Sequence, residues 1–150
     1  MKPTQFAYDR PDSVEEALEL LDEHEDAELL AGNQSLGIIM ANRFASPGRL
    51  VDINRLDDLA FVDVSDSRVE IGAMTRHRTL ERHDELRSIL AVIPEAAEQI
   101  AGPAVRNRGT MGGSVAEADP AGNYPTVLSA LGGELHVASI DRPRTIPADA

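Results

Sequence analysis

The sequence contains no cysteine and no tryptophan, and it has no long apolar run. Without cysteine, the chain can form no disulfide, no thiolate metal site and no iron–sulfur cluster on its own thiolates. No apolar stretch approaches the roughly 18 residues of a membrane-spanning helix. The N-terminal sequence M-K-P-T-Q-F-A-Y-D-R also lacks the apolar core of a secretory signal. We therefore expect a cytoplasmic protein with no membrane span.

Basic residues are also scarce, and Lys2 is the only lysine. The formal net charge is −12, and many of the acidic residues fall between Asp9 and Glu28. Such a surface repels nucleic acid and anionic membranes, so neither is an expected partner. Two interpretations of the acidic segment remain: a solvated helix face, which we favour, or a docking surface for a basic partner.

The remaining composition predicts a folded chain of 150 residues with 42% hydrophobic residues, enough for one domain with a core. A helix is expected after Ser13, because Ser13 and Glu16 have the spacing of a capping box and apolar residues then recur at helical intervals. Strands are expected at 28–31 and 49–53, and a second helix at 36–42. With the extended start at 6–8, this β-α-β-α-β order favours a small parallel sheet that ends near Leu56.

The second part of the chain has a different pattern. Residues 60–64 and 68–73 alternate around Ser65-Asp66-Ser67, which predicts a hairpin. We expect Thr75 to cap a helix that runs to about His83, and residues 86–101 to form two helices broken at Pro94. A helical segment at 126–131 and a strand at 134–140 follow, and 142–147 has the pattern of one more strand. This order predicts an antiparallel sheet with helices to one side.

A glycine-rich stretch from Arg108 to Pro125 reads R-G-T-M-G-G-S-V-A-E-A-D-P-A-G-N-Y-P. Gly112 and Gly113 have no Cβ, so the backbone there can come very close to a ligand. Exposed N–H groups and short hydroxyls at such a place suit a ribose or a diphosphate. A bare Gly-Gly pair is also typical of a hairpin turn followed by a loop.

A second stretch, Leu29–Leu36 (L-L-A-G-N-Q-S-L), strengthens the binding interpretation. An apolar run ends at Gly32, small and polar residues follow, and a short apolar helix is expected next. A strand that turns through small residues into a helix presents free N–H groups, which suit a pyrophosphate. The stretch is neither G-x-G-x-x-G nor a G-x-x-x-x-G-K-[ST] loop, so a nicotinamide-binding Rossmann domain is disfavoured.

Taken in order, three motifs resemble one known family: A-G-N-Q-S-L-G, then I-G-A-M-T at 71–75, then G-T-M-G-G-S-x-x-x-A-D-P-x-G-N-x-P. They are similar to the FAD-binding subunit of the molybdenum hydroxylases, which include xanthine dehydrogenase and aerobic carbon monoxide dehydrogenase. The resemblance implies an α+β, two-lobed FAD-binding domain of the p-cresol methylhydroxylase/vanillyl-alcohol oxidase type. A parallel lobe would cover about 1–56, and a mainly antiparallel lobe about 57–150. Since that family's domain continues further, the second lobe is expected to be C-terminally truncated.

The same resemblance implies a set of cofactor-binding residues. Backbone N–H groups of the first stretch and the Ser35 hydroxyl would hold the FAD pyrophosphate, and the second stretch would approach the ribityl and diphosphate region. Ile100 would pack on the adenine, and Asn123 would bond the adenosine ribose. Ser114 and Asn123 stand where the family commonly has asparagine and aspartate. This implies that uncharged side chains contact the cofactor and bind it more weakly. The full expected set is Leu29, Leu30, Ala31, Gly32, Asn33, Gln34, Ser35, Leu36, Ile100, Thr110, Met111, Gly112, Gly113, Ser114 and Asn123.

The resemblance also implies a function: a flavoprotein subunit of an oxidoreductase complex. It would take electrons from 2Fe–2S clusters on a small subunit, which a molybdenum-cofactor large subunit has reduced, and pass them to NAD or another acceptor. No catalytic acid or base is expected, because the flavin supplies the chemistry. His77 and His83 are expected to be exposed or capping rather than metal ligands. The alternative is a truncated, non-catalytic interaction module that does not hold FAD tightly alone.

Overall fold

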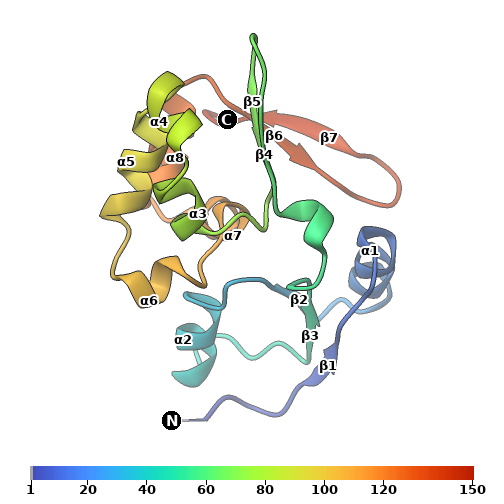
Figure 1. Ribbon diagram of the computed structural model, residues 1–150. Helices are drawn as coiled ribbons and strands as arrows, with labels where there is room; N and C mark the ends of the chain where they lie inside the picture. The colour runs from blue at the N-terminus through green and yellow to red at the C-terminus, as the bar shows by residue number, and fades with distance from the viewer. Residues whose placement is uncertain (1) are drawn as a thin grey trace.

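Three short strands form a parallel sheet in the N-terminal part of the chain, whose residues 2–150 are described by a computed structural model (Figure 1). The strands are β1 (Ala7–Asp9), β2 (Ala27–Leu30) and β3 (Arg49–Asp52), in the spatial order β1-β3-β2. Both outer strands pair with β3 in parallel, and Val51 at its centre has no exposed surface. The predicted parallel sheet is therefore confirmed.

The two crossover connections of this sheet carry α1 (Val14–Glu23) and α2 (Leu36–Ala41). Ser13 caps α1 as predicted, because its hydroxyl accepts the Glu16 N–H at 3.1 Å. The Glu16 carboxylate reaches back one residue further than a capping box requires and accepts the Asp12 N–H at 2.8 Å. The acidic side chains of α1 at positions 15, 16, 19, 22 and 23 are exposed, which fits a solvated acidic face.

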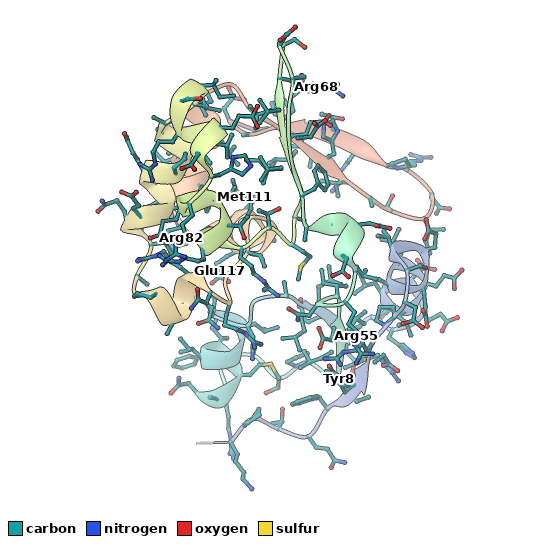
Figure 2. The ribbon with its side chains drawn as sticks, in the orientation of Figure 1. Tyr8, Arg55, Arg68, Arg82, Met111 and Glu117 are labelled. Atoms are coloured by element: carbon teal, nitrogen blue, oxygen red, sulfur yellow. The ribbon has the colours of Figure 1, made fainter. Side chains whose placement is uncertain are left out.

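A short 3-10 helix, η1 (Asp57–Leu59), leads out of the sheet into a hairpin. Strands β4 (Val62–Val64) and β5 (Val69–Ile71) pair antiparallel, as the alternation of residues 60–73 predicts. Arg68, which directly precedes β5, lies near the tip of this hairpin and away from the body of the molecule (Figure 2).

Six helices follow the hairpin: α3 (His77–Glu81), α4 (Asp84–Ile89), α5 (Val92–Gln99), α6 (Pro103–Arg106), α7 (Met111–Glu117) and α8 (Asn123–Ala130). The prediction that Thr75 caps α3 is wrong, because Arg76 is the N-cap and the Thr75 hydroxyl donates to the Phe61 carbonyl at 2.8 Å. The two helices expected within 86–101 are confirmed, but the break between them lies at residues 90–91 and not at Pro94. Pro94 lies in the first turn of α5, where a missing N–H costs no helical bond.

The chain ends in a second hairpin, formed by β6 (Glu134–Val137) and β7 (Arg144–Pro147). The strand pattern at 142–147 is thus confirmed, whereas the strand expected at 134–140 is shorter. The two hairpins form separate two-stranded sheets rather than the single antiparallel sheet that the order of elements suggested. Local alternation predicts a hairpin but does not say which strand lies beside it.

Two hydrophobic clusters hold the α+β fold together. One lies under the parallel sheet and includes Ala17, Val51 and Met74. The other lies among the helices and includes Leu80, Ile93 and Tyr124, with side chains of the β4–β5 hairpin packed against it. Met74 is the third residue after β5, yet it belongs to the first cluster, so the segment at 72–76 connects the two parts of the molecule.

None of the helices within residues 2–150 combines the length and the apolar character that crossing a membrane requires.

Candidate functional site

The first glycine stretch connects the end of β2 to the start of α2 and carries a run of unengaged donors. Within residues 2–150, the backbone N–H groups of residues 32–36 donate to no acceptor of the chain. Asn33 has a left-handed backbone, with a φ of 59°, which asparagine tolerates better than most residues. Ser35 is the N-cap of α2, and its hydroxyl makes no cap hydrogen bond. This stretch therefore offers N–H donors and a hydroxyl, as predicted.

The other expected contributors of the first stretch lie in or beside β2. Leu29 is exposed and Leu30 half-buried, and both pair with β3 in the parallel ladder. Ala31 also packs against the core cluster under the sheet. The Gln34 side chain folds back and donates to the Gly32 carbonyl at 2.8 Å. The sheet thus holds one end of the stretch while its donors remain open.

The second glycine stretch is the start of a helix and not the loop that the sequence suggested. Thr110 is the N-cap of α7, and its hydroxyl accepts the Gly113 N–H at 3.1 Å. The Met111 N–H donates to the Thr75 carbonyl at 2.9 Å, and the Gly112 N–H donates to the Ala73 carbonyl at 2.8 Å. The Ser114 N–H completes the first helical turn to the Thr110 carbonyl at 3.1 Å. The prediction that Gly112 and Gly113 supply free N–H donors is therefore wrong.

The glycines of α7 instead allow close packing. A Cβ on Gly112 would lie 2.6 Å from the Ala73 Cβ, so only glycine lets α7 approach the segment after β5. Gly113 is exposed, and a Cβ there would meet only the Thr110 hydroxyl, at 2.8 Å. The Met111 side chain, labelled in Figure 2, is 4% exposed and belongs to the helical core, which leaves almost none of its surface for a cofactor.

The two glycine stretches touch, although about eighty residues separate them in the sequence. Gly32 is buried against the backbone just before α7, where a Cβ would lie 2.5 Å from the Arg108 carbonyl oxygen and 2.7 Å from the Gly109 Cα. Only a residue without a side chain fits this contact. The free donors of residues 32–36 are therefore held beside the start of α7.

Two polar side chains that sequence reasoning missed fix this junction. The Asn54 side chain donates to the Ala31 carbonyl at 2.8 Å, at the end of β2. Arg76 donates to the Asn54 side-chain oxygen at 2.8 Å and, through its other terminal nitrogen, to the Arg108 carbonyl. Burial and the neighbouring Arg108 charge lower the pKa of Arg76. The position of Asn54 directly after a buried strand was the only sequence signal for this bridge.

Asp52, at the end of β3, belongs to the same hydrogen-bond network. It accepts hydrogen bonds from Tyr8 and from Arg10 at 2.9 Å, and from the Asn54 side chain at 2.6 Å. Burial opposes its ionisation, but the hydrogen bonds from Tyr8, Asn54 and Arg10 outweigh burial and lower the pKa of Asp52 to about 2. Asp52 is therefore a buried carboxylate that stays charged.

His77 and Tyr124 lie in the interior beneath the start of α7. Their ring centroids are 5.4 Å apart, and a Cβ on Gly109 would lie 2.6 Å from the His77 ring. Among the residues described, neither His77 Nδ1 nor the Tyr124 hydroxyl has a hydrogen-bond partner. Burial, assisted by the Arg76 charge, lowers the pKa of His77 to about 4. The expectation of an exposed or capping His77 is therefore wrong, whereas His83 is capping, because its Nδ1 accepts the Leu86 N–H at 3.2 Å.

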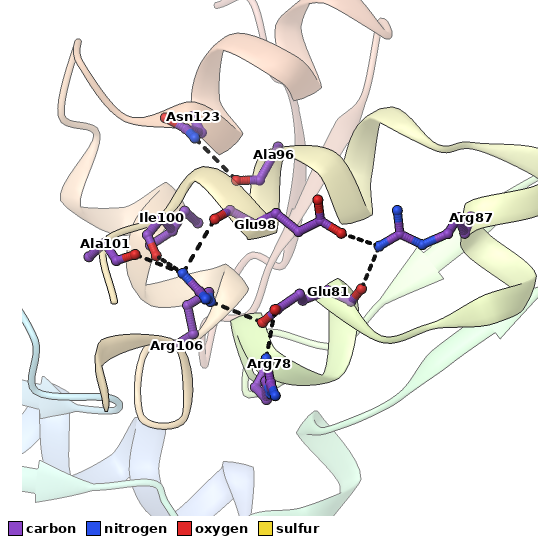
Figure 3. A network of polar contacts seen from close by, with 9 residues as sticks. All are labelled: Arg78, Glu81, Arg87, Ala96, Glu98, Ile100, Ala101, Arg106 and Asn123. Atoms are coloured by element: carbon purple, nitrogen blue, oxygen red, sulfur yellow. Dashed lines mark hydrogen bonds and ion pairs between the residues drawn. The ribbon is translucent and has the colours of Figure 1, made fainter. Parts of the chain in front are cut away.

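Ile100 and Asn123 stand at the ends of two helices, α5 and α8, that pack against each other. Ile100 is the half-buried C-cap of α5, and Asn123 is the first residue of α8. The Asn123 side-chain nitrogen donates to the Ala96 carbonyl of α5 at 3.1 Å (Figure 3). The Asn123 side-chain oxygen accepts no hydrogen bond from the part of the chain that is described, so it remains available to a ligand hydroxyl.

A family profile described as "FAD binding domain in molybdopterin dehydrogenase" matches residues 4–150 of the chain. The 6-hydroxypseudooxynicotine dehydrogenase complex subunit alpha of Paenarthrobacter nicotinovorans is 46% identical over 148 residues, which cover 98% of this chain and 50% of that protein. The carbon monoxide dehydrogenase medium chain of Hydrogenophaga pseudoflava is 41% identical over 150 residues, which cover 99% of this chain and 52% of that one.

Solved structures agree with these sequence matches. A carbon monoxide dehydrogenase chain from Hydrogenophaga pseudoflava superposes with a TM-score of 0.96 at 42% identity, covering 99% of this chain and 52% of that chain. A chain of quinoline 2-oxidoreductase from Pseudomonas putida 86 gives a TM-score of 0.95 at 33% identity, with the same coverage. The chain thus spans about half the length of these relatives.

Proposed function

Because the chain belongs to the family of FAD-binding domains of molybdopterin dehydrogenases, we propose that it forms the FAD-binding part of an electron-transfer subunit in a molybdenum hydroxylase-type oxidoreductase. The observation that carries this proposal is the run of unengaged N–H groups at residues 32–36, held by Gly32 against the start of α7. Such donors suit the two phosphates of FAD.

Different residues of the chain suit different parts of FAD. The donors of residues 32–36 and the Ser35 hydroxyl bind the diphosphate, each charge-assisted hydrogen bond contributing about 1.5–3 kcal/mol before the losses on binding. The exposed backbone at Gly113 and the Thr110 and Ser114 region meet the neighbouring ribityl chain. Ile100 packs on the adenine, and the Asn123 side-chain oxygen accepts a ribose hydroxyl. A cofactor held by these residues would lie between the parallel-sheet lobe (about 1–56) and the second lobe (about 57–150).

FAD, when bound, supplies the ability to exchange electrons singly or in pairs. The protein contributes binding and positioning: Asn54 and Arg76 hold the two glycine stretches together, and Asp52 holds Asn54. We assign no catalytic acid or base to this chain. The subunit takes electrons from 2Fe–2S clusters on a small subunit and passes them to NAD or another acceptor.

The names of the relatives support the choice of partners. One relative is a subunit of a dehydrogenase complex, others are medium chains, and one superposable structure is described as lacking the Mo-pyranopterin moiety of the molybdenum cofactor. We therefore infer that the partners are a large subunit with the molybdenum cofactor and a small subunit with 2Fe–2S clusters. The acidic face of α1 is available to either of them.

One observation favours a second candidate function. The N–H groups of residues 111–114 are all engaged within the chain, and so is the Asn123 side-chain nitrogen. Fewer donors then remain for the cofactor than the sequence suggested. On this alternative, the chain is an interaction module of the same complex and does not hold FAD tightly alone.

A visible absorption spectrum separates the two functions. The purified chain is mixed with FAD and passed through gel filtration, and its folded state is checked by circular dichroism. Flavin absorption that travels with the folded protein is the result we expect. A folded chain that elutes colourless would instead favour the interaction module.

A further inference from the structure

The turn that follows α5 is held by one side chain from the next helix. Arg106, in the last turn of α6, folds back so that its Nη1 donates to the Ala101 carbonyl at 2.7 Å and the Ile100 carbonyl at 2.9 Å (Figure 3). A longer contact of 3.3 Å reaches the Glu98 carbonyl. Carbonyls at the end of a helix lack helical partners and attract a cation. Since α5 has no basic residue in its own last turn, Arg106 takes that place.

Arg106 is itself held in position from the other side. Its Nε donates to a carboxylate oxygen of Glu81 at 2.9 Å, and the other oxygen of Glu81 accepts from Arg78 at 2.6 Å. The side chains of Arg106 and Glu81 are only 12% and 13% exposed. A guanidinium fixed by a carboxylate and offering a planar fork of donors is a more rigid support than a lysine ammonium.

The turn requires such support because its backbone is unfavourable. Ala101 has a φ of 38°, in the left-handed region that an alanine side chain disfavours. Ala101 and Gly102 are both exposed, so little packing stabilises this conformation. Ile100 stands directly before this turn, and the Arg106 bond to its carbonyl fixes the direction in which the chain leaves α5.

We propose that Arg106 is a positioning residue for the adenosine end of the FAD site. It acts through the backbone carbonyls of Ile100 and Ala101, and thereby holds the Ile100 side chain where it packs on the adenine. This inference rests on the proposed function, because it takes Ile100 and Asn123 as the adenosine contacts. Arg106 therefore contributes to the affinity for the adenosine half of the cofactor and not to the affinity for the flavin half.

The test compares two flavins on the full 150-residue chain. FAD carries the adenosine half, whereas FMN carries the flavin and one phosphate without it. Arg106→Gln removes the charge and the planar fork of donors, and Arg106→Lys keeps a charged donor without the planar fork. Arg87→Gln is the matched control, because Arg87 donates to Glu81 and Glu98 in the same network without contacting the turn. Dissociation constants are measured on folded, monodisperse protein well below its melting temperature.

We expect Arg106→Gln to bind FAD about tenfold more weakly, which corresponds to about 1.4 kcal/mol, with FMN affinity changed less than about twofold. Arg106→Lys should lose about threefold for FAD, and it carries the test if Arg106→Gln does not fold. Arg87→Gln should match the wild type for both flavins. A purely structural role would lower the melting temperature and leave the FAD-to-FMN affinity ratio unchanged.

Two outcomes overturn the inference while the proposed function stands. One is wild-type FAD affinity in the folded Arg106 variants, and the other is an equal loss for FAD and FMN. A folded wild-type chain that binds no FAD would instead refute the proposed function, and the inference with it.

Discussion

The backbone of Gly32 lies directly against the backbone of Gly109, so close that a Cβ on Gly32 would stand 2.7 Å from the Gly109 Cα. Real Cβ atoms do not approach other atoms this closely, so any side chain at position 32 must move the two segments apart. Gly32 ends the run out of β2, and Gly109 precedes the cap of α7. One contact therefore sets the spacing between the two stretches proposed to hold FAD.

Replacing Gly32 with alanine should separate these stretches and weaken FAD binding. The neighbouring atoms are backbone and cannot rotate away, so we expect a loss of about 1–3 kcal/mol in the free energy of unfolding. FAD affinity should fall at least about tenfold. Urea titration and flavin titration measure the two effects. Gly102→Ala is the control for stability, because a Cβ there meets nothing within 4 Å. Full FAD affinity in a folded Gly32→Ala variant would show that the contact is not needed for binding.

The adjacent glycines of α7 should respond differently to substitution. A Cβ on Gly112 would press on Ala73, so Gly112→Ala should destabilise the fold by about 1–3 kcal/mol. Gly113 is exposed, and a side chain there meets only the Thr110 hydroxyl, so Gly113→Leu should leave the fold intact and block the cofactor. Thermal unfolding and FAD titration of both variants test the contrast. If Gly113→Leu bound FAD normally, the site would not include the start of α7.

Local sequence signals predicted the N-terminal half of the fold well. Ser13 with Glu16 marks the start of α1, and strands alternating with helices give a parallel sheet. The same kind of reasoning failed at Gly112 and Gly113, because glycine is a poor helix former and usually signals a turn. The Thr110 cap and the carbonyls of Ala73 and Thr75 override that preference in the structure. These partners come from distant sequence, so no local pattern contains them.

The candidate site likewise combines features that the local sequence predicts with features that depend on distant residues. The free donors of residues 32–36 follow from a strand that turns into a helix, which the sequence does show. The bridge from Asn54 through Arg76 to Arg108, and the return of Arg106 to the end of α5, depend on how helices pack. Glu81 illustrates the limit, because only one of its two arginine partners lies on its own helix. It does pair with Arg78 at 2.6 Å, but it also binds Arg106 from α6 at 2.9 Å.

His77 should make the protein less stable below neutral pH. The pKa of His77 is about 4 in the folded chain, against an ordinary value of 6.5. Between these two pH values the unfolded chain therefore binds a proton at His77 and the folded chain does not. Stability is therefore complete above about pH 6.5 and falls as the pH drops from 6.5 to 4, by up to about 3 kcal/mol. His77→Phe keeps a ring against Tyr124 and removes the titration. Urea titrations between pH 8 and pH 4.5 should show a steeper loss in the wild type than in His77→Phe. Parallel curves would mean that the buried histidine does not control this range.

Asp52 should also make stability depend on pH, but at lower pH than His77 and through its negative charge. Its folded-state pKa is about 2 against an ordinary 3.8, so its contribution is complete above about pH 4 and is lost as the pH falls through 2. The shift corresponds to about 2 kcal/mol at neutral pH. Asp52→Asn keeps the shape and removes the charge that binds Arg10, so it should be less stable than the wild type by about that amount at pH 7.

The difference in the free energy of unfolding between wild type and Asp52→Asn should shrink as the pH falls from 4 toward 2. Protonation then removes the charge of Asp52 in the wild type, as the substitution does at every pH. Asp63→Asn, at an exposed position of β4, makes the same change in net charge and should behave like the wild type throughout. A constant difference between pH 7 and pH 2 would assign the effect of Asp52→Asn to lost geometry. A difference that closes would show that the ionised carboxylate holds Asn54, and through Asn54 the end of β2, where the free donors begin.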